Sequence, residues 1–108
     1  MYLQKINLKN KYALVTGAGK GLGRACSIAL AEGGATVIAL SRTSSDLDKL
    51  EKKIKNIKGK IIKVHCDVMN YEDLKKKIDK IKIIDILVNN AGTNFPEPFE
   101  KIKQKSMN

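Results

Sequence analysis

The sequence predicts an α/β fold in which helices cover both faces of a parallel β-sheet. Short, strongly apolar runs of the kind that form buried strands alternate along the chain with stretches of about ten to fifteen residues whose apolar positions follow helical spacing. Glycines follow several of these runs, where the chain has to turn. A chain of 108 residues has room for one domain with one core, so all the strands are expected in one sheet.

The first part of the chain predicts two buried strands with a helix between them. Residues 12–16 form an apolar run that ends at a glycine, as a fully buried parallel strand does, and residues 36–40 form a second such run. A helix is expected over residues 22–32, because the glycine pair that follows is a stop signal. The apolar face expected of this helix comprises Leu22, Cys26, Ala29 and Leu30.

A second helix and a third strand follow. Ser44 or Ser45 is expected to cap a helix that ends near Gly59. Its apolar positions, at steps of three and four residues, are Leu47, Leu50, Ile54 and Ile57. Residues 60–66 then predict a strand whose partly alternating polarity suits a place near the edge of the sheet.

The rest of the chain predicts one more helix and one more strand. Asn70 is expected to cap a helix that begins at Tyr71. The apolar face expected of it comprises Leu74, Ile78 and Ile81. A fourth strand is expected over residues 83–88, a loop with two prolines over 92–99, and the start of a further helix over 100–108.

Strands and helices that alternate in this way are joined by right-handed crossovers, which gives a parallel sheet. We therefore predict a Rossmann-type sheet of strand order 3-2-1-4 with helices on both faces. Residues 1–108 are expected to form a single, partial domain that is truncated before strand five.

The charge of the chain limits its partners. The formal net charge is +10, from 21 basic and 11 acidic residues, and such an excess favours binding to the phosphates of a nucleic acid. All of these basic residues except Arg24 and Arg42 are lysines, however, and surfaces that read bases favour arginine. The lysines alternate with isoleucines, as on the solvated faces of amphipathic helices. We expect no nucleic-acid partner, although a basic nucleic-acid binder remains a minor alternative.

The cysteines and the hydropathy pattern indicate in which cellular compartment the protein is expected. Cys26, Cys66 and the single His65 are too few for a metal site, and the cysteines are expected to be small buried hydrophobic residues in a reducing compartment. The start of the chain has no apolar stretch of the signal-peptide kind, and no run is long enough to cross a membrane. A cytoplasmic protein without a metal or a membrane partner is expected.

A glycine-rich turn between the first strand and the first helix is the first candidate site. Its spacing, TGxxxGxG from Thr16, lets the backbone approach a pyrophosphate at the positive end of a helix. The candidate residues are Gly17, Gly19, Lys20, Gly21, Leu22 and Gly23. A second turn, Asn-Asn-Ala-Gly over residues 89–92, follows the fourth strand. In the order 3-2-1-4 these two turns converge on one crevice at the carboxyl ends of the strands.

These two motifs, together with Asp67 and Val68 after the third strand, resemble the short-chain dehydrogenase/reductase family over roughly residues 7–99. The resemblance implies an NAD(P)-dependent oxidoreductase whose cofactor lays its pyrophosphate over residues 17–23. It further implies that Asp67 and Val68 lie at the adenine. Asn89, Ala91 and Gly92 would run beside the ribose and nicotinamide. The resemblance also implies a small carbonyl or alcohol substrate and homo-oligomers of the full-length enzyme.

The residues after the second strand favour NADP(H) over NAD(H). An acid there would bond the ribose 2′-hydroxyl of NAD, but the sequence has Ser41, Arg42 and Thr43. Arg42 can pair with a 2′-phosphate, and Lys20 can reach the same group. The alternative is that both cations are simply solvated.

The family's catalytic serine, tyrosine and lysine lie beyond residue 92, so this chain is expected to contain none of them and to be inactive alone. Tyr71 and Lys75 match the spacing of the catalytic pair. They precede the fourth strand in a lysine-rich helix, however, and we interpret the match as coincidence. A non-catalytic NADP(H)-binding module is the alternative function.

Overall fold

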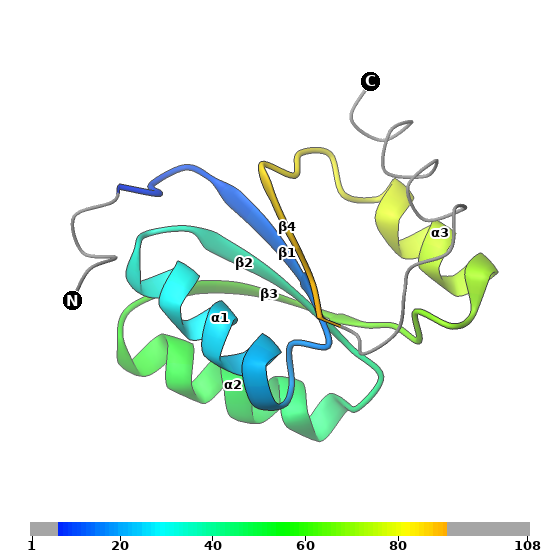
Figure 1. Cartoon of the computed structure of the whole chain (residues 1–108), viewed down its shortest axis with the longest axis horizontal. Helices are drawn as coiled ribbons and strands as arrows, with labels where there is room; N and C mark the ends of the chain where they lie inside the picture. Colours follow the sequence, from blue (N-terminus) through cyan, green and yellow to red (C-terminus); the bar gives the residue numbers. More distant parts are fainter. Residues whose placement is uncertain (1–6, 91–108) are drawn as a thin grey trace.

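The computed structural model describes residues 7–90, which form a parallel sheet of four strands in the order β3-β2-β1-β4 (Figure 1). The elements are β1 Tyr12–Thr16, α1 Gly21–Glu32, β2 Thr36–Ser41, α2 Ser44–Asn56, β3 Lys60–His65, α3 Tyr71–Asp79 and β4 Ile86–Asn89. The predicted fold class and strand order are therefore confirmed. Residues 92–108, for which a loop and a helix are predicted, lie outside the described part.

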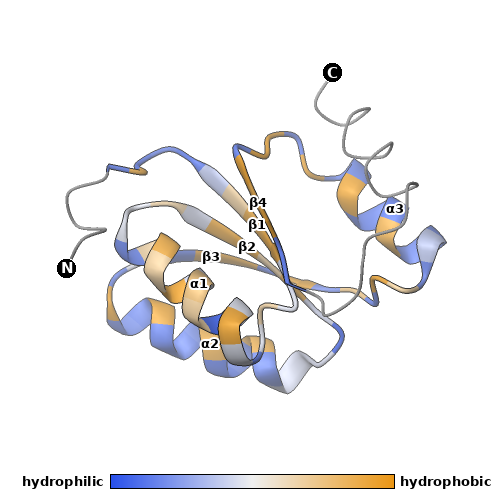
Figure 2. Cartoon of the chain, viewed as in Figure 1, coloured by the Kyte–Doolittle hydropathy of each residue, from blue (hydrophilic) through white to orange (hydrophobic). Residues whose placement is uncertain are grey.

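The helices form layers on both faces of the sheet, with α1 and α2 on one face and α3 on the other (Figure 1). Alternate residues of the strands enter two separate cores. The core under α2 includes Val15, Val37, Leu47, Leu50 and Ile54. The core under α3 includes Leu14, Ile38, Leu40, Leu74 and Ile78. Figure 2 shows the resulting stripes of hydrophobic and hydrophilic residues on α2 and α3.

The predicted apolar face of α1 is only partly correct, because of its four residues Leu30 packs against the core under α2. Leu22 is 68% exposed, and Cys26 is only half-buried. The buried residues are Gly23, Ser27 and Ala31 instead. These small residues at steps of four let the helix approach the sheet closely, and the Ser27 hydroxyl donates to the carbonyl oxygen of Gly23 at 2.8 Å. Close backbone packing outweighs side-chain hydrophobicity on this helix.

The ends of α2 differ from the prediction by a few residues. Thr43, rather than Ser44 or Ser45, is the N-cap, and its side chain makes no capping hydrogen bond. The helix ends before Ile57, which is 41% exposed rather than part of the buried face. Lys58 follows with a φ of 58°, so the backbone turns before it reaches Gly59.

Strand β4 begins at Ile86, three residues later than predicted. Its pairing with β1 starts at Ala13, because Asp85 binds the preceding residue of β1 with both its backbone and its side chain. Ile84 enters the core and is 4% exposed, whereas Ile83 is 56% exposed. Asp85, within the predicted apolar run, thus ends the loop before β4 instead of joining the strand.

Helix α3 begins as predicted. The Asn70 side chain accepts a hydrogen bond from the backbone amide of Asp73 at 3.1 Å, and Leu74 and Ile78 are fully buried. Over residues 7–90, we find no helix with the length and hydropathy that a membrane crossing requires.

Candidate functional site

The carboxyl ends of the four parallel strands bring their loops together around a cavity of about 400 Å³. The cavity is lined by Gly17, Gly19, Lys20, Leu40, Ser41, Arg42, Thr43, Asp46, Cys66, Asp67, Val68, Met69 and Asn90. Residues that follow each of the four strands therefore meet at one place, as the strand order requires.

The glycine turn presents the N-terminus of α1. Lys20 is the N-cap, its side chain makes no capping hydrogen bond, and no acidic residue lies in the first turn. The first amides of a helix have no partner within the helix and carry its partial positive charge. Gly21 has a φ of +52°, and a Cβ added there would meet nothing within 4 Å. The first turn of α1 thus has no side-chain cap, and at Gly21 it leaves space in which an anion could approach its amides.

The glycine turn and the loop after β4 are in direct contact. A Cβ added to Gly23 would overlap the carbonyl oxygen of Gly17 and lie 2.7 Å from the side-chain amide nitrogen of Asn90. The backbone amide of Asn90 donates to the Thr16 hydroxyl at 2.9 Å, and Thr16 is fully buried. The ends of β1 and β4 are therefore locked together beside the cavity.

The loop after β2 is held by its neighbours. The Thr43 amide donates to the Ser41 hydroxyl at 3.1 Å. A ring nitrogen of His65 lies 2.9 Å from the carbonyl oxygen of Arg42. These contacts fix the backbone on both sides of Arg42. The Arg42 side chain is exposed and lines the cavity, so it can reach an anion there.

Asp46 adds a negative charge to the cavity, and its place there was not predicted from the sequence. It lies in the first turn of α2, and a Cβ added to Gly19 would lie 2.5 Å from its own Cβ. Its carboxylate is 3.9 Å from the Lys20 ammonium, and the two side chains are 14% and 82% exposed, respectively. The cation predicted to bind phosphate is therefore paired with a largely buried carboxylate.

The loop after β3 forms another wall of the cavity. Cys66 is 2% exposed, and burial, followed by the nearby Asp73 carboxylate, raises the pKa of its thiol to about 11. The Asp67 carboxylate accepts a hydrogen bond from the Met69 amide at 2.9 Å and so shapes the turn. Cys66 thus supplies a neutral thiol, and Asp67 a second acidic group.

Most of the predicted binding residues meet in this cavity. Those that line it are Gly17, Gly19, Lys20, Ser41, Arg42, Thr43, Asp67 and Val68. Gly21, Leu22 and Gly23 form the adjoining first turn of α1. Asn89 is the last residue of β4, and it is the next residue, Asn90, that reaches the cavity. Ala91 and Gly92 lie outside the described residues.

The sequence interpretation missed Thr16, Leu40, Asp46, Cys66, Met69 and Asn90. Thr16 belongs to the TGxxxGxG motif and Asn90 to the second motif, so the patterns held a signal for both. Tyr71 is 48% exposed at the start of α3, and neither it nor Lys75 is among the residues that line the cavity.

Comparison with known proteins identifies the family to which this fold belongs. The family described as short chain dehydrogenase matches residues 11–108, nearly the whole chain. This chain belongs to the short-chain dehydrogenase family. The L-xylulose reductase of Bos taurus is 37% identical over 101 residues, which are 94% of this chain and 40% of that relative. This member of the family thus spans about two fifths of the length of that relative.

Solved structures of the family carry both kinds of nicotinamide cofactor. A metagenomic short-chain oxidoreductase in complex with NADP aligns with a TM-score of 0.75 and 29% identity, over 79% of this chain and 40% of the other. A 7α-hydroxysteroid dehydrogenase in complex with NADH and 7-oxo-glycochenodeoxycholic acid aligns with a TM-score of 0.73 and 30% identity, over 78% and 34%. Nicotinamide-cofactor chemistry is thus common to the family, and these relatives differ in the form they hold.

Proposed function

We propose that this chain forms the NADP(H)-binding part of an oxidoreductase that moves hydride between the nicotinamide ring and a carbonyl or alcohol carbon of a small molecule. One observation carries the proposal: Lys20, at the uncapped N-terminus of α1, and Arg42 line the same cavity. A dinucleotide phosphate needs an anion-binding helix end and a cationic pocket within reach of each other.

The residues present fit the cofactor. Gly21, where an added Cβ would meet nothing within 4 Å, leaves the space beside the first turn of α1 open. The backbone amides at this helix end would hold the pyrophosphate. Arg42, Lys20 and the hydroxyls of Ser41 and Thr43 would hold the 2′-phosphate. Asp67 and Val68 would contact the adenine. Asn89, Ala91 and Gly92 would run beside the ribose and the nicotinamide.

The cofactor, when bound, supplies the hydride donor or acceptor. The protein must also orient a substrate and exchange a proton with its oxygen. Family members assign that work to a serine, a tyrosine and a lysine beyond the segment described in this structure. We therefore propose that the described residues bind and orient the cofactor, and that catalysis needs the family's further residues.

The preference for NADP(H) follows from the charges around the loop after β2. Arg42 offers two parallel N–H donors to a phosphate, and Lys20 adds a second positive charge. The negative charge of Asp46 opposes the attraction of Arg42 and Lys20 for a phosphate. The Asp46 carboxylate lies 3.9 Å from the Lys20 ammonium, however, which partly neutralises its charge. Residues 41–43, directly after β2, include no acid that would bind the ribose 2′-hydroxyl of NAD. We therefore expect these residues to stabilise a bound 2′-phosphate more than a free 2′-hydroxyl.

Calorimetric titration of the 108-residue chain with NADPH and with NADH tests this. The chain should bind NADPH more tightly, and Arg42→Asp should reverse the order, because a phosphate pair is lost and a repulsion gained. Lys52→Asp, on the exposed face of α2 and outside the cavity, makes the same change in charge and should leave the order unchanged. Equal affinities of the unaltered chain for both cofactors would refute the assignment of Lys20 and Arg42.

A further inference from the structure

A second cavity, of about 560 Å³, lies between β3 and the end of α3. It is lined by Tyr12, Ile38, Ile62, Lys63, Val64, His65, Lys77, Lys80, Ile81, Lys82 and Ile83. None of these residues lines the cavity at the carboxyl ends of the strands. The family motifs that mark the cofactor site therefore do not account for it.

The floor of this second cavity is apolar and partly open to solvent. Ile62 on β3 is 46% exposed, and Ile83 on the loop before β4 is 56% exposed, although both are large hydrophobic side chains. Ile38, the neighbour of Ile62 on β2, is almost fully buried beneath them. Exposed isoleucines that gather in a hollow, rather than singly on a convex surface, are typical of a binding surface.

The rim of this cavity is strongly basic. Lys77, Lys80 and Lys82 line it from α3 and the loop that follows, and none of the three forms an ion pair with another residue of the described segment. Lys63 is different, because it pairs with Asp48 at 3.0 Å and Glu51 at 3.1 Å. Among the residues that line the cavity, none is acidic.

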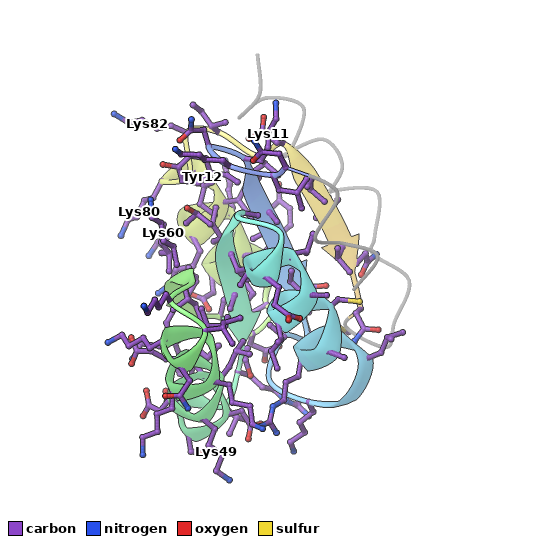
Figure 3. All side chains as sticks on the ribbon, turned by 90° about the vertical axis from the view of Figure 1, so that its left-hand side faces the viewer. Lys11, Tyr12, Lys49, Lys60, Lys80 and Lys82 are labelled. Atoms are coloured by element: carbon purple, nitrogen blue, oxygen red, sulfur yellow. The ribbon has the colours of Figure 1, made fainter. Side chains whose placement is uncertain are left out.

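The lysines stand at one end of the apolar floor. Figure 3 shows Lys80 and Lys82 projecting into solvent at the end of the molecule where Tyr12 lies, far from Lys49 on α2. An apolar hollow with cations on one rim matches a ligand that has an apolar body and one anionic head. A flexible ammonium is a point charge, which suits a single carboxylate without a demand for fixed geometry.

We propose that this second cavity binds a long-chain carboxylate. Its alkyl chain lies on Tyr12, Ile62 and Ile83, and its carboxylate pairs with Lys80 and Lys82. The size of the cavity falls within the range of small-molecule sites, roughly 300–1,000 Å³. This concave shape favours a small amphiphile over a macromolecule, which would need a broader surface. The proposal rests on residues other than those of the cofactor site, so either can fail without the other.

Titration of the 108-residue chain with dodecanoate below its micelle concentration, followed by calorimetry, tests the proposal. Saturable binding at one site per chain is expected. Lys80→Glu combined with Lys82→Glu should weaken it by about tenfold or more, since two attractions become repulsions. Ile62→Ser should weaken dodecanoate binding because it removes part of the apolar floor. Because Ile62 is already 46% exposed, the fold should tolerate the change. Lys49→Glu, at the far end of the molecule, should have no effect.

Three ligand controls separate the parts of the interaction. Dodecanol, with the same chain and no charge, and acetate, with the head alone, should both bind much more weakly than dodecanoate. Binding of dodecanoate that was unaffected by every variant, or absent in the unaltered chain, would overturn the proposal. Tighter binding to phosphatidylglycerol vesicles or to an acidic peptide than to dodecanoate would also overturn it, and would make the surface a docking face. NADPH titration and thermal unfolding of each variant verify that the fold is intact.

Discussion

Replacing Asp46 with Asn should raise the affinity for NADPH more than the affinity for NADH. The Asp46 carboxylate lies 3.9 Å from the Lys20 ammonium, and both groups line the cavity in which Arg42 stands. A 2′-phosphate that contacts Lys20 would bring a second negative charge near this carboxylate. Both cofactors share the charges of the pyrophosphate, but only NADPH carries the 2′-phosphate and therefore the additional repulsion.

The size of the effect follows from Coulomb's law. A phosphate oxygen in contact with Lys20 would stand about 7 Å from the carboxylate, where two unit charges repel by roughly 0.6 kcal/mol in water and 2.4 kcal/mol at the effective dielectric constant of a protein surface. The lost Lys20–Asp46 pair is itself worth only about 0–1 kcal/mol, because Lys20 is 82% exposed. We expect NADPH to bind about tenfold more tightly, equivalent to about 1.4 kcal/mol.

Calorimetry of both cofactors at low and high salt measures this effect. The gain should shrink as salt is added, because the charges are partly exposed and therefore screened. Asp48→Asn is the matched control, since Asp48 lies on the same helix but pairs with Lys63 outside the cavity. Weaker NADPH binding by Asp46→Asn would refute the reasoning, and would mean that Asp46 holds Lys20 in a productive position.

Two further predictions concern the framework of the site. Gly23→Ala should lower the midpoint of thermal unfolding and weaken the binding of both cofactors alike, because the added Cβ would overlap the Gly17 carbonyl. Such overpacking costs about 1–3 kcal/mol, whereas Gly33→Ala, whose Cβ would meet only the Leu8 side chain within 3.4 Å, should cost less. Cys66, studied in a Cys26→Ser background, should react slowly with iodoacetamide at pH 8, because its pKa is raised to about 11, and faster as the pH approaches that value. Rapid labelling at pH 8 in the folded chain would contradict the buried thiol.

The alternation of strands and helices could be predicted from sequence because each element has its own local signal. The apolar runs around Leu14 and Ile38 are short and bounded by turns, and Asn70 caps the helix that it precedes. The strand order then follows from right-handed connections. The predictions are wrong where a contact between residues far apart in the sequence determines the local structure. The start of β4 depends on what Asp85 binds on β1, and the buried face of α1 depends on how closely Ser27 lets it approach the sheet.

The candidate sites show the same division between local patterns and distant contacts. That Lys20 and Arg42 line the cavity could be predicted, because each stands at a fixed sequence spacing from the glycines. Asp46 contacts Lys20 only because the fold brings α2 against Gly19. The sequence predicts a solvated face for the lysines of α3, and Lys75 and Lys76 are indeed exposed, whereas Lys77 is half-buried. Composition alone does not show that Lys80 and Lys82 surround an apolar hollow, because Ile62 and Ile83 come from other elements. Local spacing is therefore enough where a motif fixes the place of a charge, as for Lys20 and Arg42. Where the neighbours come from other elements, as for Asp46, Lys80 and Lys82, only the folded chain shows what surrounds the charge.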